Sequence, residues 1–293
     1  MNVINAKLDI IFKKLFTSDK TVLMAFIGDL LDIPQGKIQK LEVLNPELLP
    51  ETADGKQGQL DIKMQVDNKI VNVEIQVQMQ SDYKERALYY WSKMFSNELK
   101  KGEHYAELKQ TISINILNFN LFDCEEPYST FKLLETDRQE LMTDKCAILF
   151  FELRKVNKSI DKADRKKLWL QLINAETEED LAMIKETGVS EINKAIVIMH
   201  EMSEDEKIRE MARLREKWIL DENSNREFFR RQGLEEGRAE GRAEGKAEGR
   251  AEGRAEGEAA GIEKGEANKE KEIISKLRKK GFSEEEIKDI LNS

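Results

Sequence analysis

Two neighbouring stretches in which polar and apolar residues alternate constrain the fold of this chain more than any other feature. Residues 60–66 read LDIKMQV and residues 70–79 read IVNVEIQVQM, so apolar side chains recur at every second position. A period of two is typical of β-strands that place one face on an apolar core. Between the stretches lies Asp67-Asn68, a pair that tolerates the left-handed backbone of a tight turn. The sequence therefore predicts a β-hairpin here.

The length of the predicted turn determines which residues face one another. With Asp67 and Asn68 alone in the turn, pairing outward from it places Asp61 directly opposite Glu74. Facing residues of antiparallel strands have Cβ atoms about 4.5–5.5 Å apart, so two carboxylates repel each other there. A divalent cation removes this repulsion, and Mg²⁺ is held by one or two carboxylates together with water and phosphate. The pattern predicts a metal site at Asp61 and Glu74.

Gln76 lies two residues beyond Glu74 on the same strand face, where its amide group can orient an attacking water molecule. A metal ion in such a site lowers the pKa of bound water and stabilises charge on phosphate oxygens, which favours phosphodiester hydrolysis. The competing interpretation is a solvated sheet face, on which acidic residues are ordinary. The many Asn and Gln residues on these strands are unusual for such a face.

The flanking sequence alternates helical and strand patterns, which predicts an α/β fold. The segment at 146–153 is nearly continuous in apolar residues, so this strand is expected to be buried on both faces. The predicted elements are helices within residues 1–32 and at 82–101, strands at 41–45, 111–118 and 146–153, and helices over most of 161–232.

From Glu236 to Gly261 the sequence repeats the four residues EGRA with little variation. Each glycine costs a helix about 1 kcal/mol relative to alanine, and like charges recur at i,i+4, so an isolated helix is marginal. Two alternatives remain open: a flexible linker, or a helix whose Gly/Ala stripe packs against a second copy. Further on, Gly281 and Ser283 predict a small helical hairpin. Oligomerisation or docking is the expected role, and contact with phosphates through Lys276, Arg278, Lys279 and Lys280 is the alternative.

Composition and charge limit the classes of function. With 40% hydrophobic and 36% charged residues, the chain has the balance of a folded protein. A net charge of -9 argues against coating nucleic acid through bulk electrostatics, which depends on many lysine and arginine contacts. Cys124 and Cys146 support neither a disulfide framework nor a zinc site, and a signal peptide or membrane anchor is not indicated. A cytoplasmic protein without membrane contact is expected.

Three blocks of sequence carry a family resemblance through their order and spacing. They are LDIIFKKLF (8–16), QLDIKMQVDNKIVNVEIQVQM (59–79) and RALYYWSKMFSNELKKGEHYAELKQTISINILNF (86–119). Together they resemble the Rpn family of recombination-promoting nucleases, also described as PD-(D/E)XK nuclease family transposases, over about residues 1–220. The resemblance implies an α/β fold with a restriction-endonuclease-like PD-(D/E)XK core, a mixed sheet flanked by helices, and a helical C-terminal extension. It also implies roles in DNA recombination, mobile elements or defence against foreign DNA.

By this resemblance, Asp61 occupies the first acidic motif position and Glu74-Ile75-Gln76 the (D/E)-x-K position, with Gln76 in place of lysine. The departure keeps both carboxylates and removes the usual lysine. Lys63 faces the same way and is either a substitute for it or an ordinary solvated lysine. Asp9 matches the acidic residue of the family's first helix, and is either an additional metal ligand or a carboxylate that favours a helix N-terminus.

Arg86 and Tyr90 lie one helical turn apart and are candidates for binding the substrate, with sheet packing or a surface ion pair as the alternative. The sequence thus predicts a Mg²⁺-dependent endodeoxyribonuclease that hydrolyses phosphodiester bonds in DNA. The alternatives are a non-catalytic DNA-binding or oligomeric regulatory protein on the same fold, and a protein-interaction module.

Four segments are expected along the chain. The first two are a nuclease-like core over residues 1–160 and a helical region over 161–232 that packs on it. The repeat occupies residues 233–268 as a linker or a helix, and the helical hairpin occupies 269–293. These last two segments are the candidates for contacts within a homo-oligomer.

Overall fold

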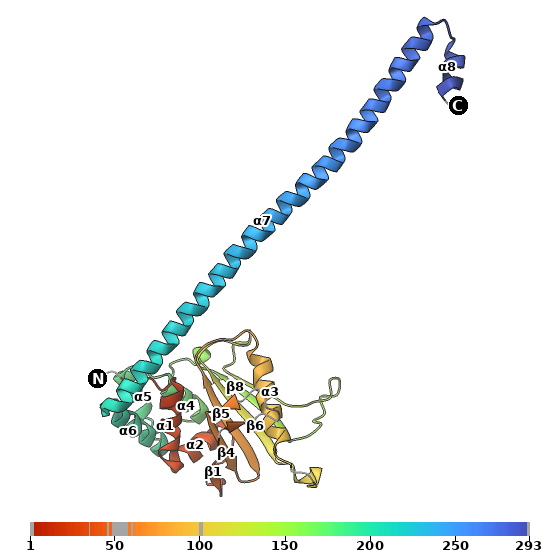
Figure 1. Cartoon of the computed structure of the whole chain (residues 1–293). Coiled ribbons are helices and arrows are strands. Elements are labelled where there is room, and N and C mark those ends of the chain that lie inside the picture. Colours follow the sequence, from red (N-terminus) through yellow and green to blue (C-terminus); the bar gives the residue numbers. More distant parts are fainter. Residues whose placement is uncertain are drawn as a thin grey trace. The chain divides into compact units, whose positions relative to one another are not determined.

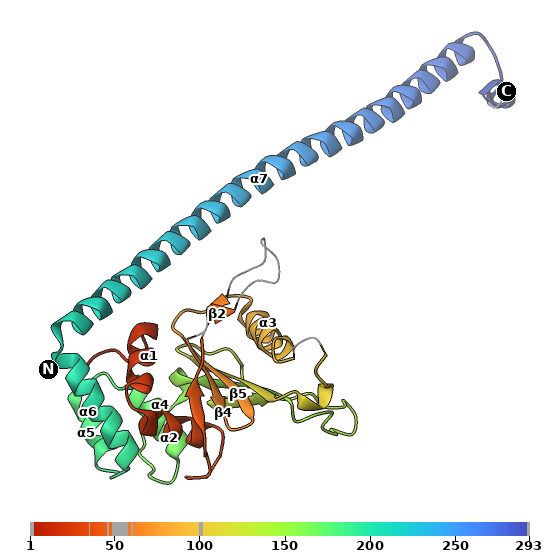
Figure 2. The same cartoon turned by 60° about the horizontal axis from the view of Figure 1, so that its bottom comes forward.

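Residues 3–34, 36–45, 47–48, 58–59, 61–99 and 102–291 are described by a computed structural model (Figures 1 and 2). Leu60, Lys100 and Lys101, which the sequence places at the edges of a strand and a helix, lie outside the described residues. In chain order the elements are α1 (Asp9–Thr17), α2 (Lys20–Leu30), β1 (Leu41–Val43), β2 (Glu47–Leu48), β3 (Gly58–Gln59), β4 (Ile62–Val66), β5 (Lys69–Gln76), α3 (Tyr83–Ser96), η1 (Tyr105–Glu107), β6 (Gln110–Leu117), β7 (Tyr128–Phe131), β8 (Cys146–Glu152), η2 (Leu153–Lys155), α4 (Arg165–Asn174), α5 (Glu178–Lys185), α6 (Ser190–Glu204), α7 (Glu206–Lys279) and α8 (Glu284–Leu291).

A six-stranded mixed sheet has the strand order β1-β4-β5-β6-β8-β7. The first three strands form an antiparallel meander, β5, β6 and β8 run parallel, and β7 returns antiparallel at the far edge. Parallel neighbours need a crossover connection, and α3 lies in the one that joins β5 to β6. The predicted mixed sheet with flanking helices is therefore confirmed. The sequence did not indicate β7, nor the separate two-stranded sheet of β2 and β3.

The hairpin of β4 and β5 has the register that the sequence predicts. Pairing runs from Val66 with Lys69 at the turn to Ile62 with Val73. Asp67 adopts the left-handed backbone with a φ of 49°, and its Oδ1 accepts the N–H groups of Gln39 and Lys40 at 3.0 and 2.8 Å. The turn is thereby tied to the chain that leads into β1. The strand β5 ends at Gln76, three residues before the predicted end.

Helices cover both faces of the sheet (Figures 1 and 2). On one face α1, α2, α4, α5 and α6 build the larger core, in which Phe16 stacks on Phe26 with ring centroids 3.9 Å apart. Trp169 meets Phe26 edge-on at 5.5 Å. On the opposite face α3 packs through Tyr83 and Trp91. This two-sided covering leaves little of the central strands exposed.

The strand β8 is buried on both faces, as its apolar sequence predicts. Its side chains alternate between the two cores, Ala147, Leu149 and Phe151 in the larger one and Cys146, Ile148 and Phe150 in the smaller one. Burial on both faces is expected of a strand in the parallel part of a sheet that helices cover on both sides.

The contacts within the chain divide it into two units, Met1–Ile219 and Leu220–Ser293. The first unit therefore ends inside α7, before the predicted end of the helical region at residue 232. Ile208 and Ala212, in the first turns of α7, are buried. Among the described residues, no helix is both long enough and apolar enough to cross a membrane.

The second unit contains the rest of α7, then α8. The four-residue repeat lies within α7 and is helical in the structure, while packing of its Gly/Ala stripe against a second copy stays a prediction. Three of the four repeated residue types, Glu, Arg and Ala, are good helix formers. Gly281, with a φ of 90°, follows the end of α7 as predicted, and Arg278 pairs with Glu284 at 2.7 Å across the bend.

Candidate active site

Asp61 and Glu74 occupy the predicted facing positions at one end of the hairpin. Asp61 directly precedes Ile62, Glu74 directly follows Val73, and these two inner residues are paired. The carboxylate of Asp61 points across to β5, where its Oδ2 accepts the backbone N–H of Ile75 at 2.8 Å. Glu74 is only 9% exposed. The hairpin register thus brings two largely buried carboxylates together.

Burial and a neighbouring negative charge raise the pKa values of both Asp61 and Glu74. Burial is the main cause that raises the pKa of Asp61 to about 6, and the nearby charge of Asp9 adds to it. The N–H of Ile75 and the charges of Lys13 and Arg215 oppose the rise. Burial also raises the pKa of Glu74 to about 7, with the charge of Asp61 second. The charge of Asp61 thus favours the protonated form of Glu74.

A buried layer of polar side chains lies on the Glu74 face of the sheet, beneath α3. The Asn72 Nδ2 donates to Oε1 of Glu74 at 3.2 Å, while the Asn72 Oδ1 is buried and accepts no hydrogen bond from the described residues. Tyr83 donates its hydroxyl to Asn115 at 3.1 Å, and Asn115 in turn donates to Ser113 at 3.2 Å. This layer was not predicted, although the polar residues at alternate positions of TISINILN mark it in the sequence.

Asp9 is the first residue of α1, and both of its oxygens are held by Arg215. The Arg215 Nε and Nη2 donate to Oδ1 and Oδ2 of Asp9 at 2.8 and 2.7 Å. Among the described residues, no three His, Cys, Asp or Glu side chains are grouped as a metal-ligand set. The structure thus places Asp9 near Asp61, where its charge is felt, but pairs it with a cation. A ligand role for Asp9 stays a prediction that requires release from Arg215.

Arg215 and Lys13 are cations beside Asp61 that the sequence did not reveal. Arg215 lies in α7, 206 positions from its partner Asp9, so no local pattern connects them. Lys13 lies on α1, one turn beyond Asp9, in the block that carries the family resemblance. Both charges oppose the rise in the Asp61 pKa.

Gln76 and Lys63 flank the acidic pair on the predicted side of the sheet. Gln76 ends β5, and its Nε2 donates to the backbone oxygen of Gln78 at 3.4 Å. Lys63 is paired with Asn72 across the hairpin, so its side chain emerges on the Glu74 face. The expectation that Lys63 faces the same way is confirmed, and the catalytic roles of both residues stay predictions.

Arg86 and Tyr90 lie together on α3. The guanidinium of Arg86 lies over the Tyr90 ring, 5.4 Å from its centroid, and its Nη1 donates to Gln80 at 2.8 Å. The charge of Arg86 lowers the pKa of Glu74, whereas burial and the charge of Asp61 raise it. Arg86 is therefore close to the acidic pair. Its Nε is buried and donates no hydrogen bond to the described residues. This cation is placed to act on Glu74, while Tyr90 supports it from beneath.

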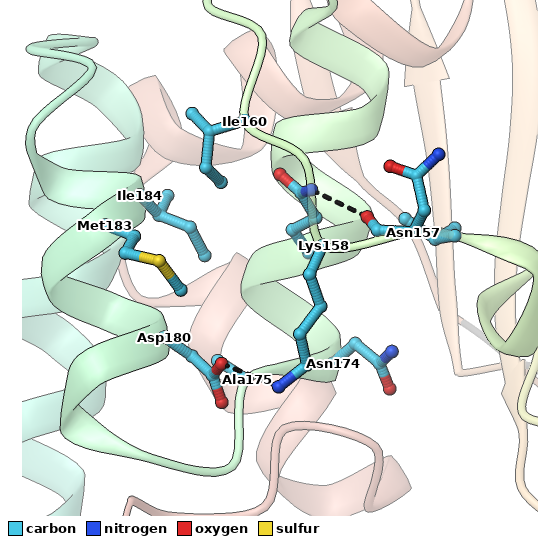
Figure 3. A pocket seen from close by; sticks show the side chains of 10 residues that line it. Asn157, Lys158, Ile160, Asn174, Ala175, Asp180, Met183 and Ile184 are labelled. Carbon is cyan, nitrogen blue, oxygen red and sulfur yellow. Dashed lines mark hydrogen bonds and ion pairs between the residues drawn. The ribbon is translucent and has the colours of Figure 1, made fainter.

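A separate pocket lies between α4, α5 and the segment that follows η2 (Figure 3). Figure 3 shows Ile160, Met183 and Ile184 on one side of it, and Lys158 paired with Asp180 at 3.1 Å on another. None of the predicted site residues lines this pocket. The candidate site is therefore the hairpin end with its acidic pair.

The family model of the PD-(D/E)XK nuclease family transposases matches residues 6–227. The chain belongs to this family. No curated protein and no solved structure matches it. Membership of the PD-(D/E)XK family confirms the family resemblance and the fold class that the sequence predicted. It also makes the chain a hydrolase of a nuclease family, and the family implies DNA as the substrate. Nucleases of the PD-(D/E)XK type generally use divalent metal ions.

Proposed function

We propose that the protein is a Mg²⁺-dependent endonuclease that hydrolyses phosphodiester bonds in DNA, in the setting of recombination, mobile elements or defence against foreign DNA. The observation that carries this proposal is the acidic pair. Two largely buried carboxylates at the end of one hairpin, with pKa values raised to about 6 and about 7, are costly to the fold in their ionised forms unless a cation offsets the charge.

The donor set at the hairpin end fits a hard cation. Asp61 uses one oxygen for the N–H of Ile75, and Glu74 uses one for Asn72, so each carboxylate retains an oxygen for a metal ion. The unpartnered Oδ1 of Asn72 adds a buried acceptor beside them that suits a metal-associated water. Mg²⁺ takes one or two carboxylates and completes its shell with water and phosphate. When bound, the ion supplies positive charge against the phosphate oxygens and acidifies water.

The remaining side chains have roles that follow from their positions. Gln76 retains its amide oxygen, which orients a water molecule by accepting a hydrogen bond from it. Lys63, on the same face, supplies positive charge near the scissile phosphate in place of the lysine that Gln76 replaces. Arg86 stabilises the ionised form of Glu74, and so favours the state that binds a cation.

Nicking of supercoiled plasmid tests the proposal. The native protein is incubated with plasmid in Mg²⁺ and in EDTA, and the Asp61→Asn variant is incubated under the same conditions. Asp137→Asn is the matched control, because Asp137 is an exposed loop residue. We expect Mg²⁺-dependent nicking that Asp61→Asn lowers by roughly 100-fold or more, since a metal ion contributes several kcal/mol to such a reaction. The Asp137→Asn variant should nick as the native protein does. Nicking that survives both EDTA and Asp61→Asn would contradict the mechanism.

A further inference from the structure

The first turns of α7 belong to the first unit, Met1–Ile219, and form hydrogen bonds with residues beside the candidate site. Arg215 holds both oxygens of Asp9. One turn further on, the backbone oxygen of Ile219 accepts a hydrogen bond from Gln78 at 3.3 Å, just beyond the end of β5. On the other side, Asn5 donates to Glu216 at 3.2 Å. This part of α7 is therefore fixed beside the acidic pair, and the side chains on it are positioned relative to that pair.

Trp218 is the exposed aromatic residue on this fixed part of α7. Its side chain is 52% exposed, whereas the other two tryptophans, Trp91 and Trp169, are 8% and 0% exposed. The guanidinium of Arg215 lies over its ring, 4.4 Å from the centroid. Because Asp9 fixes Arg215 and Arg215 covers one face of the indole, the ring is held in place while half of its surface meets solvent.

We propose that Arg215 and Trp218 bind one nucleotide of the substrate beside the acidic pair, Arg215 through its phosphate and Trp218 through an unpaired base. The inference rests on the proposed function and names the substrate class for the same site. A nucleotide carries an anionic phosphate a short distance from an aromatic base. Arg215 and Trp218 place a cation, which matches the phosphate, a short distance from an aromatic ring, which matches the base.

The chemistry of both side chains suits this ligand. A guanidinium has five N–H donors, of which Asp9 takes two, and its planar fork matches phosphate oxygens. An indole stacks on any base, because every base has a π-face. A base inside a duplex is already stacked on its neighbours, so only a base in a single strand, at an end or flipped out of the helix presents that face.

The charge of the chain favours the same mode of binding. A net charge of -9 opposes broad electrostatic attachment to DNA. Stacking on an aromatic ring does not depend on net charge, and Arg215 and Lys13 supply local positive charge at the site. The protein therefore gains affinity from a few directed contacts at an unpaired position.

Tryptophan fluorescence of the full chain provides a direct test, because Trp218 is the solvent-exposed one of the three tryptophans. The native protein is titrated in EDTA, which prevents metal-dependent cleavage, with a short oligodeoxythymidine and separately with a blunt duplex of equal length. Trp218→Ala and Arg215→Lys are titrated alongside, with binding followed by anisotropy of a labelled oligonucleotide.

The matched control is Tyr105→Ala. Tyr105 is an aromatic side chain 84% exposed, and it precedes β6, whose first residue Gln110 pairs with Lys69 at the start of β5. Glu74 and Gln76 lie at the other end of that strand, so Tyr105 is at the opposite end of the sheet from the site.

We expect the single strand to quench Trp218 fluorescence, and Trp218→Ala to weaken single-strand binding about tenfold, the effect of losing one stacked base. Blunt-duplex binding should change less than single-strand binding in this variant, and Tyr105→Ala should bind as the native protein does. Equal affinity of native protein and Trp218→Ala for the single strand overturns the inference, even if the native protein nicks plasmid in Mg²⁺. Absence of both DNA binding and plasmid nicking overturns the proposed function with it.

Discussion

Replacing Glu74 with glutamine should make the metal-free protein more stable at high pH and leave it unchanged at low pH. Glutamine has the shape of the protonated acid and retains the oxygen that accepts from Asn72. It removes the charge whose burial, together with the charge of Asp61, raises the pKa of Glu74 from 4.5 to about 7. The substitution therefore isolates the cost of the ionised carboxylate.

The direction and size of the effect follow from proton linkage. Between pH 4.5 and about pH 7 the folded protein keeps a proton on Glu74 that the unfolded chain has lost. The stability that this group contributes is thus fully present below pH 4.5 and is lost as the pH rises through 7. At 1.36 kcal/mol per pKa unit, the loss amounts to about 3 kcal/mol at pH 8. For a compact unit of this size, that is roughly 6–12 °C in melting temperature.

Thermal melts in EDTA near pH 4.5 and near pH 8 measure the difference between the native protein and Glu74→Gln. Glu125→Gln, a change at an exposed loop carboxylate, serves as the control. At high pH, Mg²⁺ should raise the melting temperature of the native protein more than that of Glu74→Gln, because the variant lacks one ligand. If Glu74→Gln melts at the native temperature at both pH values, Glu74 does not carry a buried charge and the electrostatic reasoning is wrong.

Two further changes probe other parts of the structure. Lys155→Met should lower the free energy of unfolding in urea by about 3–5 kcal/mol, because Glu152 is fully buried and its Oε2 pairs with Lys155 at 2.7 Å; an unchanged denaturation midpoint would refute this. Gly245→Ala combined with Gly249→Ala should shift the far-UV circular dichroism melt of α7 upward, since each change favours a helix by about 1 kcal/mol and an added Cβ meets no atom within 4 Å. A melt that does not move would show that the repeat is not held as a helix in solution.

The sequence predicted the hairpin most accurately because its information is local. The alternation fixed the two faces, and Asp67-Asn68 fixed the turn length, which together set the register that positions Asp61 and Glu74. The sheet order was accessible only in part, because short connections favour neighbouring strands, whereas β7 at the far edge of the sheet was not indicated. The chain's membership of the family confirms the family resemblance.

Three features were beyond sequence reasoning for physical reasons. The pairing of Asp9 with Arg215 joins residues 206 positions apart, and no periodicity links such a pair. The hydrogen bond from Tyr83 to Asn115 depends on how α3 packs over β6, which strand patterns alone do not set. The helical state of the repeat was left open because good helix formers and frequent glycines nearly balance in their propensities. The roles of Arg86, Tyr90, Gln76 and Lys63, and assembly through α7 and α8, stay predictions.

The distance in sequence between Asp9 and Arg215 also affects when the site is completed during synthesis. A ribosome delivers the hairpin with Asp61 and Glu74 well before it delivers α7, because translation runs from the N-terminus. Until Arg215 has emerged, Asp9 lacks the partner that it has in the finished fold. The acidic pair is therefore made well before the partner of Asp9, so an unfinished chain, or one cut short ahead of α7, carries the two carboxylates without the Arg215 side chain.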